Sequence, residues 1–228
     1  MRAIISLFLI SVLAWGIATA LNEIPFGAAK TKVGEYYIGR GKEQTGASNI
    51  VTSVVVNYRG FDTLGEVTVL FVAAIGLGAV LATRRKKEKR DVEPASLVLY
   101  TGCRLLFPLI LLFGAYIFIH GHLTPGGGFQ GGAVVASAFV LVYLGCRGRR
   151  ISETASKTVE SLGGLVFIVV GLVGLAVGGG YFLSNYLPKG ELNSLFSAGI
   201  IPIIYIAIGF KVGSELAGVI DHLVEESE

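Results

Sequence analysis

Six uncharged apolar runs dominate this sequence and limit what it can fold into. They cover Ala3–Leu21, Val67–Thr83, Leu105–Ile119, Ala133–Cys146, Leu162–Leu183 and Leu195–Phe210. A helix that crosses a bilayer needs about 20 predominantly apolar residues, with about 17 as the lower bound. The first, second and fifth runs reach this bound as they stand. We therefore predict an all-α integral membrane protein with about six transmembrane helices.

The three shorter runs reach spanning length only if neighbouring residues join their helices. The third would extend back through Arg104 to about Leu97, the fourth would take in Phe129–Gly132, and the sixth would continue from Lys211 to about Ala217. Composition agrees, because only 15% of the residues are charged against roughly 25% in an ordinary soluble domain. Arg104 would lie near a helix end, from which its long side chain reaches water.

The first run has an alternative interpretation. Arg2, the apolar stretch after it and Ala18–Ala20 resemble a secretory signal with an A-x-A cleavage site. We expect this segment to be retained as the first spanning helix, and cleavage is the alternative.

Basic residues indicate the topology. Arg84–Arg90 holds six positive charges, and Arg147, Arg149, Arg150 and Lys157 form a second cluster. Positive loops stay in the cytoplasm, and six helices place both clusters on the same side. We predict a multi-pass protein of the cytoplasmic membrane with both termini cytoplasmic. Its outward segments would be 22–60, 120–131 and 184–194.

Several function classes are disfavoured by the same residues. The net charge of +3 reflects topology signals, so we expect the lipid bilayer and no nucleic acid as a partner. Cys103 and Cys146 fall near predicted cytoplasmic helix ends, where thiols stay reduced, and no Cys/His metal spacing occurs. No nucleophile–base set or cofactor motif is present. We therefore expect a non-catalytic chain without a cofactor or a metal site.

A charged linker, RRKKEKRDVEPAS (84–96), divides the chain. It predicts a two-helix module over residues 1–90 and a four-helix module over residues 91–228.

Two ionisable pairs lie within or beside apolar runs, where charges usually face protein, a partner or water. Asp62 and Glu66 are four residues apart and share a face if a helix begins by Asp62. Asp62 could instead only cap that helix, whereas Glu66 is a candidate for cation or proton binding. Lys211 and Glu215 also share a face, and Lys211 would lie roughly 9 Å inside a boundary at Ala217.

The second pair allows two interpretations. It could be a snorkelling pair at the cytoplasmic rim or a proton relay at a subunit contact. Gly209, Gly213 and Ala217 form a small-residue stripe on roughly the opposite face, which predicts close helix packing there.

The stretch HGHLTPGGGFQGG (120–132) lies between the third and fourth predicted helices. His120 and His122 could handle protons, because an unperturbed histidine titrates near neutral pH. The rest forms a candidate assembly loop in which glycines permit a compact backbone. Its residues are Pro125, Gly126, Gly127, Gly128, Phe129, Gln130, Gly131 and Gly132. We expect this loop to dock against neighbouring helices and the histidines to lie at a water-filled entrance.

Two motifs resemble a known family. Gly121–Gly132 resembles the signature of the MnhB-like subunit of the Mrp-type multisubunit Na⁺/H⁺ antiporters. The stretch NYRGFDTLGEVTVLFVAAIG (57–76) resembles the C-terminal end of the large A-type subunit of these antiporters, a segment that is a separate small subunit in related membrane-bound hydrogenases. The resemblance implies a subunit of a module that exchanges monovalent cations, Na⁺ among them, for H⁺ beside other subunits. Such modules stand alone or belong to redox-driven hydrogenase and sulfur-reducing complexes.

Two other functions stay open. A purely structural membrane scaffold would use the same helices without an ion path. A self-sufficient secondary transporter would show inverted repeats and paired broken helices, and the sequence displays neither.

Overall fold

The computed structural model describes residues 2–23, 32–82, 95–146 and 152–227, and every regular element in these ranges is a helix. The elements are α1 (Arg2–Glu23), α2 (Lys32–Thr45), α3 (Ile50–Thr52), the π-helix η1 (Ser53–Tyr58), α4 (Gly60–Ala82), α5 (Leu97–Ile119), α6 (Gly128–Gly145), α7 (Glu153–Val177) and α8 (Ile201–Ser227).

Six of these helices, α1 and α4 to α8, are long and apolar enough to cross a membrane. The predicted all-α membrane fold with six spans is therefore confirmed. In α1, every described side chain is exposed, and an apolar surface all round a helix is typical of a membrane span.

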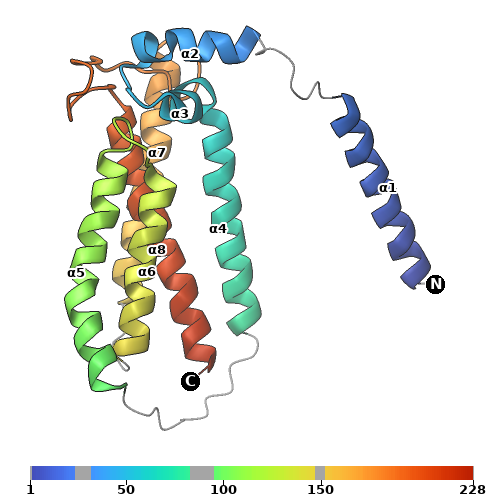
Figure 1. Ribbon diagram of the computed structural model, residues 1–228, viewed down its shortest axis with the longest axis vertical. Coiled ribbons are helices and arrows are strands. Elements are labelled where there is room, and N and C mark those ends of the chain that lie inside the picture. The colour runs from blue at the N-terminus through green and yellow to red at the C-terminus, as the bar shows by residue number, and fades with distance from the viewer. Residues whose placement is uncertain (1, 24–31, 83–94, 147–151, 228) are drawn as a thin grey trace. The chain divides into compact units, whose positions relative to one another are not determined.

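The helix α8 is the centre of a bundle formed by α4 to α8, and it contacts each of the other four. More than half of its span is buried, whereas 6% of the α4 span is buried. In Figure 1 the α5–α6 loop and the start of α4 lie at one end of the bundle, and the chain's C-terminus lies at the other. We call these the loop end and the basic end; the basic linkers 83–94 and 147–151, which follow α4 and α6, lie outside the described residues.

The fifth span differs from its predicted bounds. It runs over Glu153–Val177 instead of Leu162–Leu183, because a capped polar start precedes the apolar run. The Ser152 side chain accepts a hydrogen bond from the Ala155 backbone N–H at 3.4 Å. The helix ends before Gly179 and Gly180, whose φ angles of 139° and 84° suit glycine.

The sixth span also differs from its predicted bounds. It starts at Ile201 and reaches Ser227, whereas the predicted helix covered Leu195 to about Ala217. Ala198 and Gly199 have φ angles of 65° and 59°, so residues 195–199 do not continue the helix. The connection between α7 and α8 is therefore residues 178–200 and not only 184–194.

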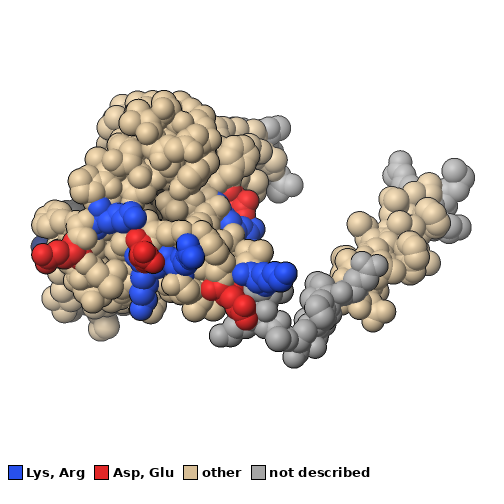
Figure 2. Space-filling view, turned by 90° about the horizontal axis from the view of Figure 1, so that it is seen from above, with Lys and Arg blue, Asp and Glu red and all other residues tan. Residues whose placement is uncertain are grey.

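The predicted outer segment 22–60 contains α2, α3 and η1 within its described part. Thr45 at the end of α2 is hydrogen-bonded to Ser53 at 2.7 Å between their hydroxyls. Lys189 in the 178–200 connection donates to the Glu43 carbonyl at 3.2 Å. Figure 2, seen from above this end, shows charged side chains gathered along one side of the bundle.

Candidate functional site

A lysine and a glutamate are buried together on α8. Lys211 Nζ donates to Glu215 Oε2 at 2.8 Å, and the two residues are 6% and 3% exposed. Glu215 Oε1 has no hydrogen-bond partner among the residues that the structure describes. Charges buried in a membrane span are costly and mark ion or proton pathways, so this pair is the strongest candidate site.

The depth of the pair corrects the sequence-based estimate. At 1.5 Å per residue, Lys211 lies about 15 Å along α8 from Ile201 and about 20 Å from Val224, the two ends of the span. Within this span the pair lies far from both helix ends, so we favour the proton relay, which stays a prediction, over a pair that snorkels at the rim. The lysine is near the middle of the span because α8 continues well beyond Ala217.

Two other helices form the walls around Lys211. On α7, a Cβ atom added to Gly163 would lie 3.1 Å from Lys211 Cβ, and one added to Gly164 would lie 3.6 Å from Lys211 Cε. On α4, the centroid of the Phe71 ring lies 5.0 Å from Lys211 Nζ, within reach of a cation–π interaction. The absence of larger side chains on this face of α7 is what makes room for the lysine.

The opposite face of α8 carries the predicted small-residue stripe, and its close packing is confirmed. A Cβ atom on Gly209 would lie 2.5 Å from Phe118 Cδ1 of α5, and one on Gly213 would lie 3.0 Å from Val135 Cγ1 of α6. Ala217 is fully buried. The face of α8 opposite Lys211 and Glu215 therefore packs closely against α5 and α6, and this packing fixes the position of the charged face.

The two acids of α4 lie on the surface of this chain. Asp62, in the first turn, forms an ion pair with Arg59, and both side chains are more than half exposed. Glu66 is exposed one turn deeper in the span. The structure does not bring either acid to Lys211, and an exposed carboxylate within a span requires water or another protein beside it.

The predicted assembly loop lies against helices of its own chain. A Cβ atom on Gly128 would lie 2.6 Å from Ile208 Cβ, and one on Gly132 would lie 2.8 Å from Val212 Cβ. Both contacts are with α8. Gly131 lies equally close to α5, while Gly126 and Gly127 are half-buried and buried. Among the larger loop residues Pro125 and Gln130 are exposed and Phe129 is half-buried.

Residues outside the Gly121–Gly132 motif form hydrogen bonds with its first part, just before the assembly loop. Asn49 Nδ2 donates to the carbonyls of Gly121 at 2.9 Å and Thr124 at 3.0 Å. Thr52 Oγ1 donates to the Gly121 carbonyl at 2.7 Å and accepts a hydrogen bond from Tyr205 OH at 2.9 Å. The Asn49 backbone N–H also donates to the His122 carbonyl at 3.1 Å, so five hydrogen bonds join the segment before α4 to the α5–α6 connection and to α8.

The two histidines have different environments. His120 is half-buried, and its ring stacks on Tyr116 with the centroids 4.2 Å apart. His122 is fully buried, so its predicted place at a water-filled entrance is wrong. Neither ring nitrogen of His122 forms a hydrogen bond with the described residues. Burial lowers the pKa of His122 below 6.5, and the nearby backbone of Ser194 and Leu195 only partly opposes this.

This environment predicts that acid weakens the loop end. Since the folded pKa of His122 is lowered, the unfolded chain binds a proton first as the pH falls below about 6.5. The stability that His122 contributes is present above that pH and is lost below it, by up to about 1.4 kcal/mol per pH unit. The apparent melting temperature of the detergent-solubilised complex should show this slope, and His122→Leu should flatten it. An identical slope in the variant would contradict the assignment.

Comparison with known proteins decides the family. Residues 98–218 match the family model described as a domain related to the MnhB subunit of Na⁺/H⁺ antiporters, which is more than half of the chain. The chain belongs to the MnhB family. The resemblance drawn from Gly121–Gly132 is thereby confirmed. Residues 1–95 match a second family model, MbhE, which describes a subunit of MBH, in agreement with the predicted likeness of the front part to a hydrogenase subunit.

The MnhB-family chain is also similar to proteins from membrane complexes. A subunit of an archaeal respiratory membrane complex, the membrane-bound sulfane sulfur reductase, is 49% identical over 98% of both chains, with a TM-score of 0.80. A chain of the Mrp complex from Dietzia sp. DQ12-45-1b is 28% identical over 97% of this chain but 26% of that one, with a TM-score of 0.74. The putative antiporter subunit mnhB2 of Staphylococcus aureus (strain Newman) is 34% identical over 46% of this chain and 82% of its own length.

Sequence reasoning missed some residues of the site. Glu160 lies on α7 one turn before Gly163, which contacts Lys211, but the predicted span began at Leu162 and excluded it. An acid one turn before an apolar run was the available signal. Asn49 and Thr52 had no such signal, because ordinary polar residues in a connecting segment do not reveal a contact about 70 residues away.

Proposed function

We propose that this multi-pass membrane protein is a non-catalytic subunit of a multisubunit cation/proton antiporter module. Its family and the complexes of its structural relatives support this role. In our proposal the module exchanges Na⁺ or a similar monovalent cation for H⁺, either alone or within a redox-driven respiratory complex. The basic end faces the cytoplasm, as the positive-inside rule indicates.

One observation supports an active part in transport, namely the Lys211–Glu215 pair at mid-depth. A scaffold gains little from such a pair, since apolar residues of similar volume usually stabilise a buried site as well or better. A pair with an unpaired carboxylate oxygen can instead accept and pass on a proton while Lys211 holds the charge in place. We infer that proton movement through the module includes Glu215.

The exposed surface of α4 supports the partner assignment. Very little of this span is buried within the chain, and it carries Asp62 and Glu66 towards the outside of the bundle. We propose that another subunit of the module covers this face and that Glu66 lines a cation path at the contact. In this arrangement residues 1–90 and 91–228 are two modules of one subunit, joined by the contacts of Asn49 and Thr52.

The substitution Glu215→Gln tests this function. It keeps the shape of the side chain and removes the titratable group, so an intact complex should lose at least about tenfold in ion-exchange rate. The measurement is Na⁺-dependent proton movement in membrane vesicles, normalised to the amount of assembled complex. Glu191→Gln, an acid exposed in the 178–200 connection, is the control and should exchange at the normal rate. Normal exchange in the assembled Glu215→Gln complex would leave only the scaffold role.

A further inference from the structure

A second acid lies beside the buried Lys211–Glu215 pair. Glu160 of α7 is half-buried, on the part of α7 that packs against the Lys211–Glu215 segment of α8. One turn away in the two directions lie Gly163, which touches α8, and Ser156, whose Oγ donates to the Ser214 carbonyl at 3.2 Å. Glu160 is therefore at the α7–α8 contact, closer to the basic end of α7 than Gly163.

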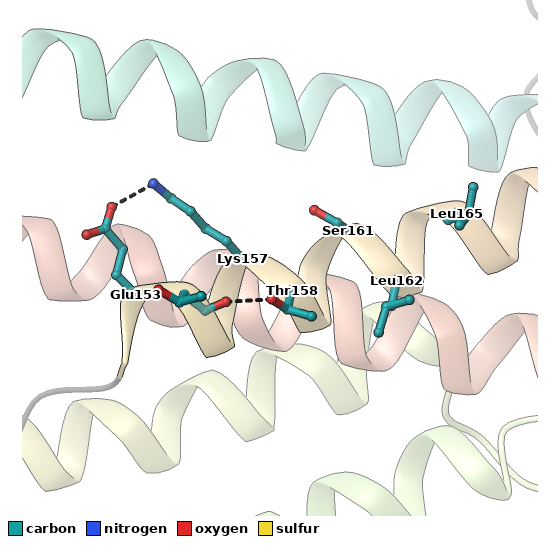
Figure 3. Close-up of a pocket in the computed structure, with 7 residues that line it drawn as sticks. Glu153, Lys157, Thr158, Ser161, Leu162 and Leu165 are labelled. Atoms are coloured by element: carbon teal, nitrogen blue, oxygen red, sulfur yellow. Dashed lines mark hydrogen bonds and ion pairs between the residues drawn. The ribbon is translucent and has the colours of Figure 1, made fainter.

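A shallow, largely open groove lies on the neighbouring face of α7, and all of its described lining residues belong to that helix. It has a volume of about 620 Å³ and lies along the first turns of the helix. Figure 3 shows Glu153, Lys157 and Ser161 among its lining residues, with Lys157 folded back onto Glu153 and Leu165 further along the helix. The side of the groove towards the basic end is polar and can hold water, whereas Leu165 marks where the apolar span takes over.

Helix geometry connects the groove to the buried pair. Glu160 follows Lys157 by three residues and precedes Gly164 by four, and residues at these separations are neighbours on a helix surface. Lys157 lines the groove, and Gly164 lies against the Lys211 side chain. Glu160 is thus the one carboxylate among the described residues of α7 that adjoins both.

We propose that Glu160 links this groove to Glu215, forming a proton path from the basic end to the middle of the membrane. The inference rests on the proposed function. It adds Glu160 as a residue of the proton path and the groove as the mouth through which water reaches that path. A proton from water in the groove binds the Glu160 carboxylate and then passes to Glu215 Oε1, the carboxylate oxygen without a partner among the described residues. Glu160 returns to its ionised form, and only O–H bonds are made and broken.

The mouth can be tested without measuring transport. Ser161→Cys should react with a charged, membrane-impermeant thiol reagent when the intact complex is treated from the basic-end side in inverted vesicles. The unsubstituted chain gives the background, because Cys103 and Cys146 are buried. Leu172→Cys is the control, since Leu172 is exposed on an apolar part of α7 and should stay unlabelled in lipid. An unreactive Ser161→Cys variant would overturn the assignment of a wet mouth.

The path itself is tested with Glu160→Gln. We expect exchange to fall at least about tenfold in a normally assembled complex, and we expect Glu160→Asp, which keeps a carboxylate, to restore most of the rate. If Glu215→Gln abolishes exchange and Glu160→Gln leaves it unchanged, the inference fails and the proposed function stands. If both variants exchange normally, the transport role fails as well.

Discussion

Lys211→Met should destabilise the chain by about 3–5 kcal/mol, because it leaves the Glu215 carboxylate buried without its cation. Methionine fits the apolar stem of the lysine between Gly163, Gly164 and Phe71, so the loss comes from the missing charge. The measurements are the apparent melting temperature of the complex in mild detergent and the amount of the chain in membranes. Both should fall well below wild type.

Two further variants separate charge from packing. The double variant Lys211→Met/Glu215→Met removes both charges, and we expect it to regain most of the lost stability while transport stays absent. Lys157→Met is the stability control, because Lys157 also forms an ion pair four residues away, with Glu153, but both side chains are 69% exposed. Breaking that pair should change stability by no more than about 1 kcal/mol. If Lys211→Met and Lys157→Met lose the same amount of stability, the Lys211–Glu215 pair is not isolated from water.

Gly132→Val should prevent α6 from docking on α8. The first carbon of the new side chain would lie 2.8 Å from Val212 Cβ, 3.0 Å from the Gly209 carbonyl oxygen and 3.0 Å from the Gly213 backbone nitrogen. Backbone atoms cannot rotate away, so the helices must separate at a cost of about 3 kcal/mol or more. We expect strongly reduced amounts of the chain and loss of its co-purification with the other subunits.

The control for this substitution is Gly76→Val. Gly76 also lies in a spanning helix, but a Cβ atom there would have no heavy atom of the described chain within 4 Å. The Gly76→Val chain should therefore accumulate normally in membranes. Its co-purification reports separately on α4, the face that we propose another subunit covers. Normal amounts of Gly132→Val would show that the α6–α8 contact tolerates a larger separation.

Hydropathy predicted the spans better where charge was absent. The run Ala3–Leu21 nearly coincides with α1, whereas Leu162–Leu183 started nine residues after the true beginning of α7. The reason is that Glu153, Lys157 and Glu160 belong to a helix whose first turns need not be apolar. The predicted end of that helix, Leu183, was also wrong, because Gly179 and Gly180 turn the chain before the apolar run finishes.

In the candidate site, too, some features could be predicted from the sequence and others could not. The spacing of Lys211 and Glu215 was enough to predict that they could pair, and their hydrogen bond at 2.8 Å bears this out. Their depth could not be predicted, because it depends on how far α8 continues. The burial of His122 could not be predicted either, because it depends on a distant segment, the connection around Ser194 and Leu195, which lies beside it.

The amino-acid sequence alone determined the membrane class, the six spans and the family, because long apolar runs and the Gly121–Gly132 motif are local properties of the chain. Only the tertiary structure decided which polar groups are desolvated and which of them meet. Burial of Lys211 and Glu215, exposure of Glu66 and the position of Glu160 all follow from how α4 and α7 lie against α8. The physical reason is that the cost of a charge depends on its three-dimensional surroundings, which helical periodicity within a single segment does not specify.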